Sequence, residues 1–164
     1  MQHICEARVS IGPDAKKRVE AAVEWYLYIL NDYLKKYGEV LSPPIIKYVD
    51  QHAANWLGRC KYRVCSEDIV DDNRGTTTIQ LQKSILNDEQ TMKRVVAHEM
   101  AHHAEMLTFW YDKQAEKLSK YGRLRLPKWC REAEVAHGSD FWEYANVINK
   151  VEGADFITKT SDEA

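Results

Sequence analysis

The chain has 164 residues, of which 45% are hydrophobic and 29% are charged. These proportions are those of an ordinary globular protein, and they exclude a disordered or fibrous chain. The formal net charge is −2, so bulk electrostatics does not indicate a nucleic-acid or membrane partner. At this length we expect a single domain over residues 1–164, with a core of about 13–152.

The N-terminus and the cysteines indicate the compartment. The first residues, M-Q-H-I-C-E-A-R, lack the apolar run of a signal peptide, and no apolar stretch approaches membrane-spanning length. No two of the four cysteines form a Cys-x-x-Cys pair, so we expect free thiols in a reducing compartment and no zinc ribbon. The sequence therefore predicts a cytoplasmic protein.

The first predicted helix begins at Pro13, because proline suits the first turn of a helix. It ends before Gly38, because glycine suits the residue that follows the last turn. Its apolar residues recur at the helical period. After Ser42-Pro43-Pro44, residues 45–49, 56–64 and 76–81 are predicted as strands. Because 76–81 ends just before the next helix, we expect it to be an edge strand that pairs with an extended substrate.

A long helix is predicted over 87–121, since no glycine or proline interrupts it and Asn87 and Asp88 are both good N-cap residues. Gly122 is expected to end it. An irregular or briefly extended segment over 124–129 and a helical turn over 131–136 should follow. A last helix is predicted over 140–151. These elements predict an α+β fold, with a small sheet beside the long helix and further helices at both ends.

The long helix carries a His-Glu-x-x-His motif, formed by His98, Glu99 and His102. Positions i and i+4 lie on one helical face, so both imidazoles can bind one metal ion. Glu99 is then placed to act on a water at that ion. His103 points about 100° away from His102 and should not reach the same ion.

A catalytic zinc site usually has three protein ligands and one open position. The downstream candidates are His137, Glu132, Glu134 and Asp140. We favour His137, because a neutral imidazole is a good zinc ligand and Gly138 lets the chain turn sharply. The glutamates remain the alternative, because two histidines and one glutamate also form catalytic sites.

The segments of this chain, taken in order, resemble the SprT-like zinc metallopeptidases, a family that includes the Spartan proteases. The resemblance covers roughly residues 15–150 and rests on four segments: Leu57-Gly58-Arg59-Cys60, Thr78-Ile79-Gln80-Leu81 with Leu86, His98-Glu99-Met100-Ala101-His102, and His137-Gly138-Ser139-Asp140-Phe141. It implies a zincin-like metallopeptidase that holds one Zn²⁺ with His98, His102 and His137, uses Glu99 as the catalytic residue, and cleaves a protein or peptide. Two departures are an insertion at about 107–136 and the lack of the zinc ribbon found in many members.

The insertion contains a run of basic residues, with aromatic residues interleaved and no acidic residue from 117 to 131. Basic side chains hold phosphates and aromatic rings stack on bases, and the family's association with DNA adds DNA as an expected partner. The predicted contacts are Lys120, Arg123, Arg125, Lys128 and Arg131. The alternative is a solvated helix end, where cations complement the helix dipole.

Two other functions remain open at this stage. One is a regulatory protease that cuts a single dedicated protein, such as a repressor, without DNA. The other is a binding module that keeps zinc for structure and cleaves nothing. The intact Glu99 argues against the binding module, because a purely structural metal site does not need that carboxylate.

Overall fold

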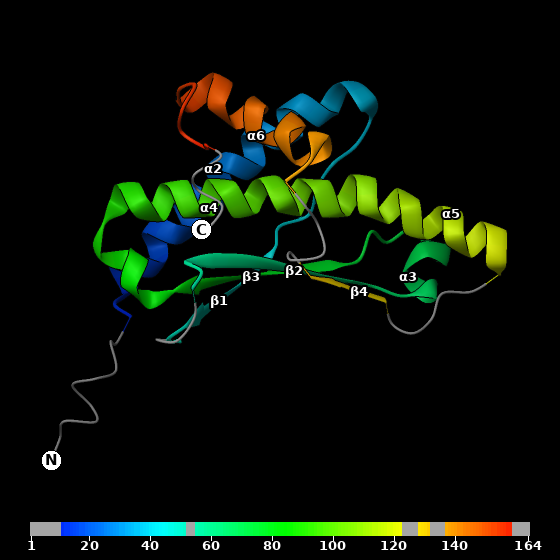
Figure 1. Cartoon of the computed structure of the whole chain (residues 1–164), viewed down its shortest axis with the longest axis horizontal. Helices are drawn as coiled ribbons and strands as arrows, with labels where there is room; N and C mark the ends of the chain where they lie inside the picture. Colours follow the sequence, from blue (N-terminus) through cyan, green and yellow to red (C-terminus); the bar gives the residue numbers. More distant parts are fainter. Residues whose placement is uncertain (1–10, 52–54, 123–127, 132–136, 159–164) are drawn as a thin grey trace, which may run out of the picture.

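The computed structural model describes residues 11–51, 55–122, 128–131 and 137–158, and it has the predicted α+β fold. Helices lie on one side of a mixed sheet (Figure 1). The elements in chain order are α2 (Pro13–Leu34), η1 (Lys35–Tyr37), β1 (Ile45–Val49), β2 (Gly58–Val64), α3 (Ser66–Val70), β3 (Thr76–Gln82), η2 (Lys83–Asn87), α4 (Glu89–Glu105), the π-helical turn η3 (Met106–Trp110), α5 (Tyr111–Tyr121), β4 (Lys128–Arg131) and α6 (Ser139–Glu152).

The strand order in the sheet is β1-β3-β2-β4. β3 pairs in parallel with β1 and antiparallel with β2, so both of its backbone edges are occupied. The prediction that 76–81 forms an edge strand is therefore wrong, and β1 and β4 are the edges. Order along the chain did not reveal this, because β1 adds to the sheet beside β3 rather than beside β2.

The first helix matches its prediction. It begins with Pro13 in the first turn and continues through η1 to Gly38, whose φ of 72° is the left-handed conformation that glycine adopts readily. Its apolar stripe packs against α4 and α6 (Figure 1). The buried members are Val19, Ala22, Val23, Tyr26, Ile29, Leu30 and Leu34.

The long helix crosses the sheet as one nearly continuous rod made of α4, η3 and α5 (Figure 1). Asp88 caps its start, because the Asp88 carboxylate accepts hydrogen bonds from the backbone N–H groups of Gln90 and Thr91. At η3 the hydrogen bonding widens to a π turn, where the Thr108 hydroxyl donates to the carbonyl of Ala104. Gly122, with φ of 78°, ends the rod as predicted.

The core lies between the sheet and the helices. Alternate residues of β2 and β3 are buried beneath α4, including Cys60, Tyr62, Ile79 and Leu81. The helical turn predicted over 131–136 is corrected in part, because Arg131 ends strand β4; residues 132–136 lie outside the described residues. Among the helices that the structure describes, none is both long and apolar enough to cross a membrane.

His103 ties three segments together from within this core. Its Nε2 donates to the carbonyl oxygen of Ser42, at 2.7 Å, which leaves Nδ1 to accept from the hydroxyl of Thr77. Burial lowers the pKa of His103 to about 4, so the imidazole is neutral near pH 7. His103 therefore fixes α4 against β3 and the segment before β1, which agrees with the expectation that it does not join His102 at a metal.

Candidate metal centre

Two histidines of α4 and one that stands just before α6 converge on one point. The Nε2 atom of His137 lies 3.1 Å from Nε2 of His98 and 3.1 Å from Nε2 of His102. The three ligand atoms all lie within 4.8 Å of one another, close enough to bind one metal ion. The structure therefore brings together the three histidines that the sequence indicated, although 34 residues separate His102 from His137.

Local structure explains how each imidazole reaches this point. His98 and His102 are one helical turn apart in the middle of α4, so they share a face. His137 stands just before α6, whose N-cap is Gly138 in an extended conformation. α6 packs against both α2 and α4, and this packing carries its N-terminal end to the histidine face.

Burial keeps the imidazoles of α4 neutral. His98 and His102 are both fully buried. Desolvation, followed by repulsion from His137, lowers the pKa of His98 to about 3, and burial lowers the pKa of His102 well below its usual value. A neutral imidazole has a free lone pair, which is the form that binds a metal ion.

Phe141 forms the wall behind the histidines. Its ring centroid lies 5.0 Å from that of His98, 4.5 Å from that of His102 and 4.7 Å from that of His137. The Phe141 side chain is fully buried. It therefore restricts the rotation of all three imidazoles.

Glu99 is buried beside the histidines, where β2 begins. A Cβ added to Gly58 would lie 3.3 Å from Cγ of Glu99, 3.4 Å from its Oε2 and 2.6 Å from Cγ1 of Val95. The absence of a side chain at Gly58 thus lets the first residue of β2 approach α4 at Glu99. The sheet therefore supports the Glu99 carboxylate directly.

Glu105 is a site residue that the sequence analysis missed. Its Oε1 lies 3.0 Å from Nδ1 of His102, and its side chain is 4% exposed. A carboxylate that accepts from Nδ1–H fixes the tautomer in which Nε2 is free to bind a metal. The signal was present in the sequence, because residues three apart on a helix are neighbours.

The three histidines fit a zinc ion chemically and geometrically. Zinc takes neutral imidazole nitrogens at about 2.0–2.1 Å, so tetrahedral geometry sets two such nitrogens roughly 3.3–3.4 Å apart. The two Nε2–Nε2 separations of 3.1 Å need only a small outward movement to reach this value. Within the residues the structure describes, the cluster contains three ligands and no fourth, as in catalytic sites.

Of the other candidate ligands, the structure describes only Asp140. Asp140 lies in the first turn of α6 and is not part of the described group of metal-binding side chains. Glu132 and Glu134 lie outside the described residues. His137 is thus the third histidine at the cluster, as the sequence analysis favoured.

The structure does not test the predicted nucleic-acid contacts. Lys120 lies in the last turn of α5, with its Nζ 5.6 Å from the ring centroid of Tyr121. Arg123 and Arg125 lie outside the described residues, and Lys128 and Arg131 are the two ends of β4. Contact between these residues and DNA stays a prediction.

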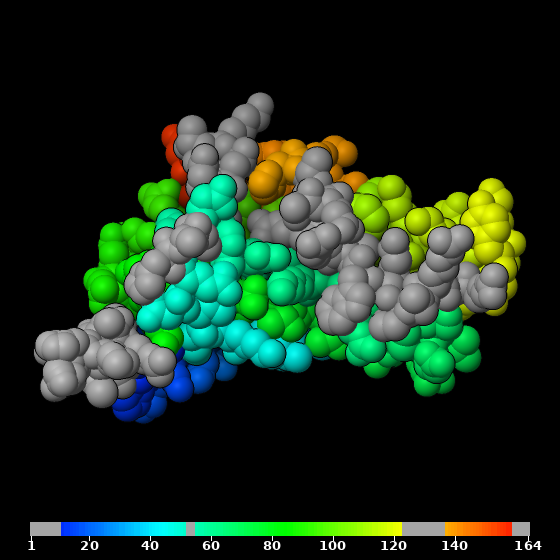
Figure 2. Space-filling view, turned by 60° about the horizontal axis from the view of Figure 1, so that its bottom comes forward, coloured from blue at the N-terminus to red at the C-terminus, as the bar shows by residue number. Residues whose placement is uncertain are grey.

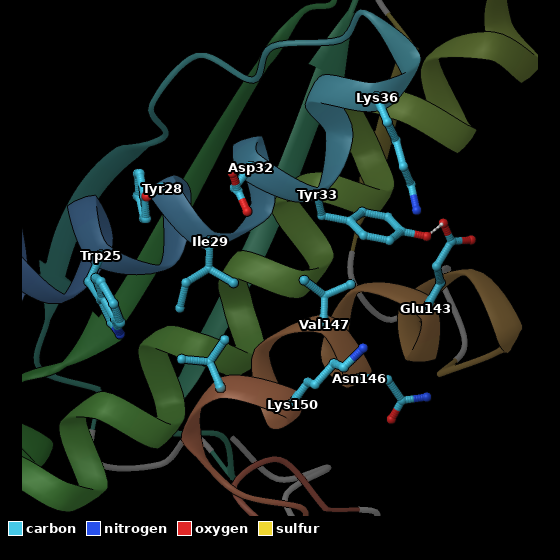
Figure 3. A pocket seen from close by; sticks show the side chains of 11 residues that line it. Trp25, Tyr28, Ile29, Asp32, Tyr33, Lys36, Glu143, Asn146, Val147 and Lys150 are labelled. Atoms are coloured by element: carbon cyan, nitrogen blue, oxygen red, sulfur yellow. Dashed lines mark hydrogen bonds between the residues drawn. The ribbon is translucent and has the colours of Figure 1, made fainter.

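A groove of about 500 Å³ lies between α2 and α6 (Figure 3). Trp25 and Tyr28 line one end of it, and the hydroxyl of Tyr33 donates to Glu143 at the other end, at 2.8 Å. None of the three clustered histidines lines this groove. It is therefore separate from the candidate metal centre.

Comparison with known proteins identifies no relative: no family model matches the chain, and no curated protein or solved structure matches it. The resemblance to the SprT-like family therefore stays a prediction, and the site must be interpreted from its own geometry.

Proposed function

We propose that this protein is a zinc-dependent, zincin-like metallopeptidase that hydrolyses peptide bonds in a protein substrate. The convergence of three histidine Nε2 atoms beside a buried glutamate carries this proposal. Histidines at i and i+4 with the glutamate between them are the ligand and base arrangement of zinc peptidases. The motif and the third histidine thus support the same chemistry.

Zinc is the proposed ion because of the ligands present. Three neutral imidazoles suit zinc, and a site with three protein ligands leaves a coordination position for catalysis. Zinc bound there would supply a Lewis acid that polarises the scissile carbonyl and acidifies water. Glu105 would hold His102 in the ligating tautomer.

Glu99 is the proposed general base. α4 fixes its backbone one residue from His98, and Gly58 of β2 packs against its side chain. Its carboxylate would take a proton from the attacking water and pass it to the leaving amine. Because the helix and the sheet both hold this side chain, little rearrangement precedes the proton transfer.

The test compares the zinc-loaded protein with a Glu99→Gln variant on an unfolded protein substrate. We expect the wild type to cleave the substrate, and the variant to retain one equivalent of zinc while hydrolysis falls roughly 10²–10⁴-fold. Equal activity of the two proteins would remove Glu99 from the mechanism. No cleavage by the zinc-loaded wild type would favour one dedicated substrate or a non-catalytic module.

The possible role of DNA requires a separate arm of this experiment. The same cleavage assay is run on a basic DNA-binding protein, with and without single-stranded DNA. Cleavage only with DNA would support a DNA-associated peptidase and give Lys120 and its basic neighbours a role. Equal cleavage in both conditions would leave the peptidase and remove DNA as its partner.

A further inference from the structure

Strand β2 places three cations on the sheet face that points away from the helices. Arg59, Lys61 and Arg63 alternate along the strand with buried Gly58, Cys60, Tyr62 and Val64. Because successive side chains of a strand point to opposite faces, these cations share the outer face. The segment R-C-K-Y-R carries this alternation in the sequence.

The register of the sheet adds a fourth cation from a different strand. Lys47 of β1 and Arg59 of β2 both pair with Gln80 of β3, so the three residues form one row across the face. Two strand spacings separate Lys47 from Arg59, which is roughly 10 Å. In the next row Thr78 lies between Ile45 and Lys61.

The three strands that carry this face bring no negative charge to it. Strands β1, β2 and β3 contain no acidic residue at all. Figure 2 views the molecule from the side of the sheet, and the cyan and green strand segments lie at the surface there. We call the outer-face residues Lys47, Arg59, Lys61, Arg63, Thr78 and Gln80 the cationic face.

Acidic residues bound the cationic face at both ends of the strands. Asp50 follows β1 directly, at one end. At the other end, Glu67 and Asp68 in α3 follow β2, and Asp71 and Asp72 precede β3. Along β2 the cationic surface is therefore about as long as one strand of seven residues, roughly 23 Å.

We propose that the cationic face docks a short acidic segment of a protein partner. Its role as a second contact for the substrate rests on the proposed peptidase function, whereas the binding itself does not. The spacing of the charges in such a segment fits the spacing of the cations. Alternate residues of an extended peptide are roughly 6.6–6.8 Å apart, and so are the alternate cations of β2. Thr78 and Gln80 supply hydrogen-bonding groups between the cations.

A nucleic-acid partner fits this surface less well. Domains that bind nucleic acid are typically basic, with a pI above about 9, whereas this chain has a net charge of −2 and a pI near 6.3. A polynucleotide longer than the face would also meet the acidic residues at its ends. A short acidic peptide ends before it reaches them.

The Arg59 side chain is held by its neighbour Trp56. Its guanidinium lies 5.1 Å from the ring centroid of Trp56, a cation–π contact that restricts the side chain. Less conformational freedom is then lost when Arg59 binds a carboxylate. Arg59 and Lys61 are therefore the two positions to change.

The experiment measures fluorescence anisotropy of a labelled peptide of alternating glutamate and serine, titrated with the full chain. We expect saturable binding that weakens as salt increases, because the charges lie at the surface. The double variant Arg59→Glu, Lys61→Glu should bind about tenfold more weakly or worse. The matched control Lys16→Glu, Lys17→Glu changes two exposed lysines on α2 and should bind as the wild type does.

Three results would overturn the proposal: no binding of the acidic peptide, equal weakening by the two double variants, or tighter binding of an oligothymidylate of equal length. Circular dichroism checks that the charge-reversed double variant is folded. If it is unfolded, the double variant Arg59→Gln, Lys61→Gln is used in its place. Peptide binding without cleavage of any protein would keep the docking surface and contradict the peptidase. Cleavage of a protein without binding of the acidic peptide would keep the peptidase and contradict the docking surface.

Discussion

At the scale of single residues, Glu105 illustrates how a side chain outside the motif acts on the site. The carboxylate lies 3.0 Å from Nδ1 of His102 and is almost completely buried. We expect Glu105→Ala to weaken zinc affinity about 10–100-fold, because His102 loses the group that orients it. Competition against a chromogenic chelator measures this affinity.

Glu105→Gln is the matched control, since an amide oxygen still accepts from Nδ1–H but carries no charge. Its zinc affinity should fall between those of the wild type and the alanine variant. Co²⁺ absorption spectra of the three proteins would show whether the ligand geometry changes. Identical affinities would mean that Glu105 contributes nothing to metal binding.

His103 is predicted to be structural, in contrast to its neighbour His102. The change His103→Leu leaves the Thr77 hydroxyl and the Ser42 carbonyl without their partner inside the protein. We expect the free energy of unfolding to fall by about 2–4 kcal/mol, with zinc affinity retained, because unsatisfied buried groups cost about 1–3 kcal/mol each. Urea denaturation of the metal-free protein gives the free energy.

Adding Thr77→Val to that variant removes one of the two unsatisfied groups. Part of the lost stability should therefore return. A His103→Leu protein as stable as the wild type would show that this link between α4, β3 and the segment before β1 carries little energy.

At the scale of elements, the contact between β2 and α4 depends on Gly58. A Cβ at this position would lie 2.6 Å from Cγ1 of Val95, so Gly58→Ala must push the strand and the helix apart. We expect it to destabilise the fold by about 1–3 kcal/mol. It should also weaken hydrolysis more than zinc binding, because Glu99 is the other neighbour.

The double variant Gly58→Ala, Val95→Ala tests the cause, since it removes the clashing methyl group and should recover stability. Gly12→Ala serves as the control, because a Cβ there has no atom within 4 Å. If the two single glycine variants unfold at the same denaturant concentration, the close approach of β2 to α4 is not important for stability.

At the scale of the whole molecule, the histidine cluster joins α4 to His137, which stands just before α6 and is distant in sequence. A ligand that binds only the folded state at a thousand times its Kd stabilises it by about 4.1 kcal/mol. For a chain of this size, that corresponds to roughly 8–16 °C in Tm. We therefore expect chelation of zinc by EDTA to lower Tm by this amount, as measured by scanning calorimetry.

The control for this prediction is His137→Ala, which removes the one ligand of the described cluster that α4 does not supply. Its Tm should depend much less on zinc than that of the wild type. A wild-type Tm that is the same with zinc and with EDTA would contradict the proposed metal centre and the function built on it.

Local patterns predicted much of the fold. The helix from Pro13 to Gly38, the cap at Asp88 and strands β1, β2 and β3 follow from backbone preferences that a few neighbouring residues determine. Three helical elements were missed, because α3 and η2 have five residues each and the π turn η3 lies inside a region of uninterrupted helical pattern. Such short or irregular elements leave little periodicity in a sequence.

The sequence by itself determined that His98 and His102 share one helical face, with Glu99 one position round from His98, because the helical period alone places them there. Only the tertiary structure decided that His137 meets them, that β3 lies inside the sheet, and that Lys47 joins the cations of β2. Each of these depends on how separate elements pack and on the register in which their strands pair. Those long-range contacts have no period along the chain, so no local pattern encodes them.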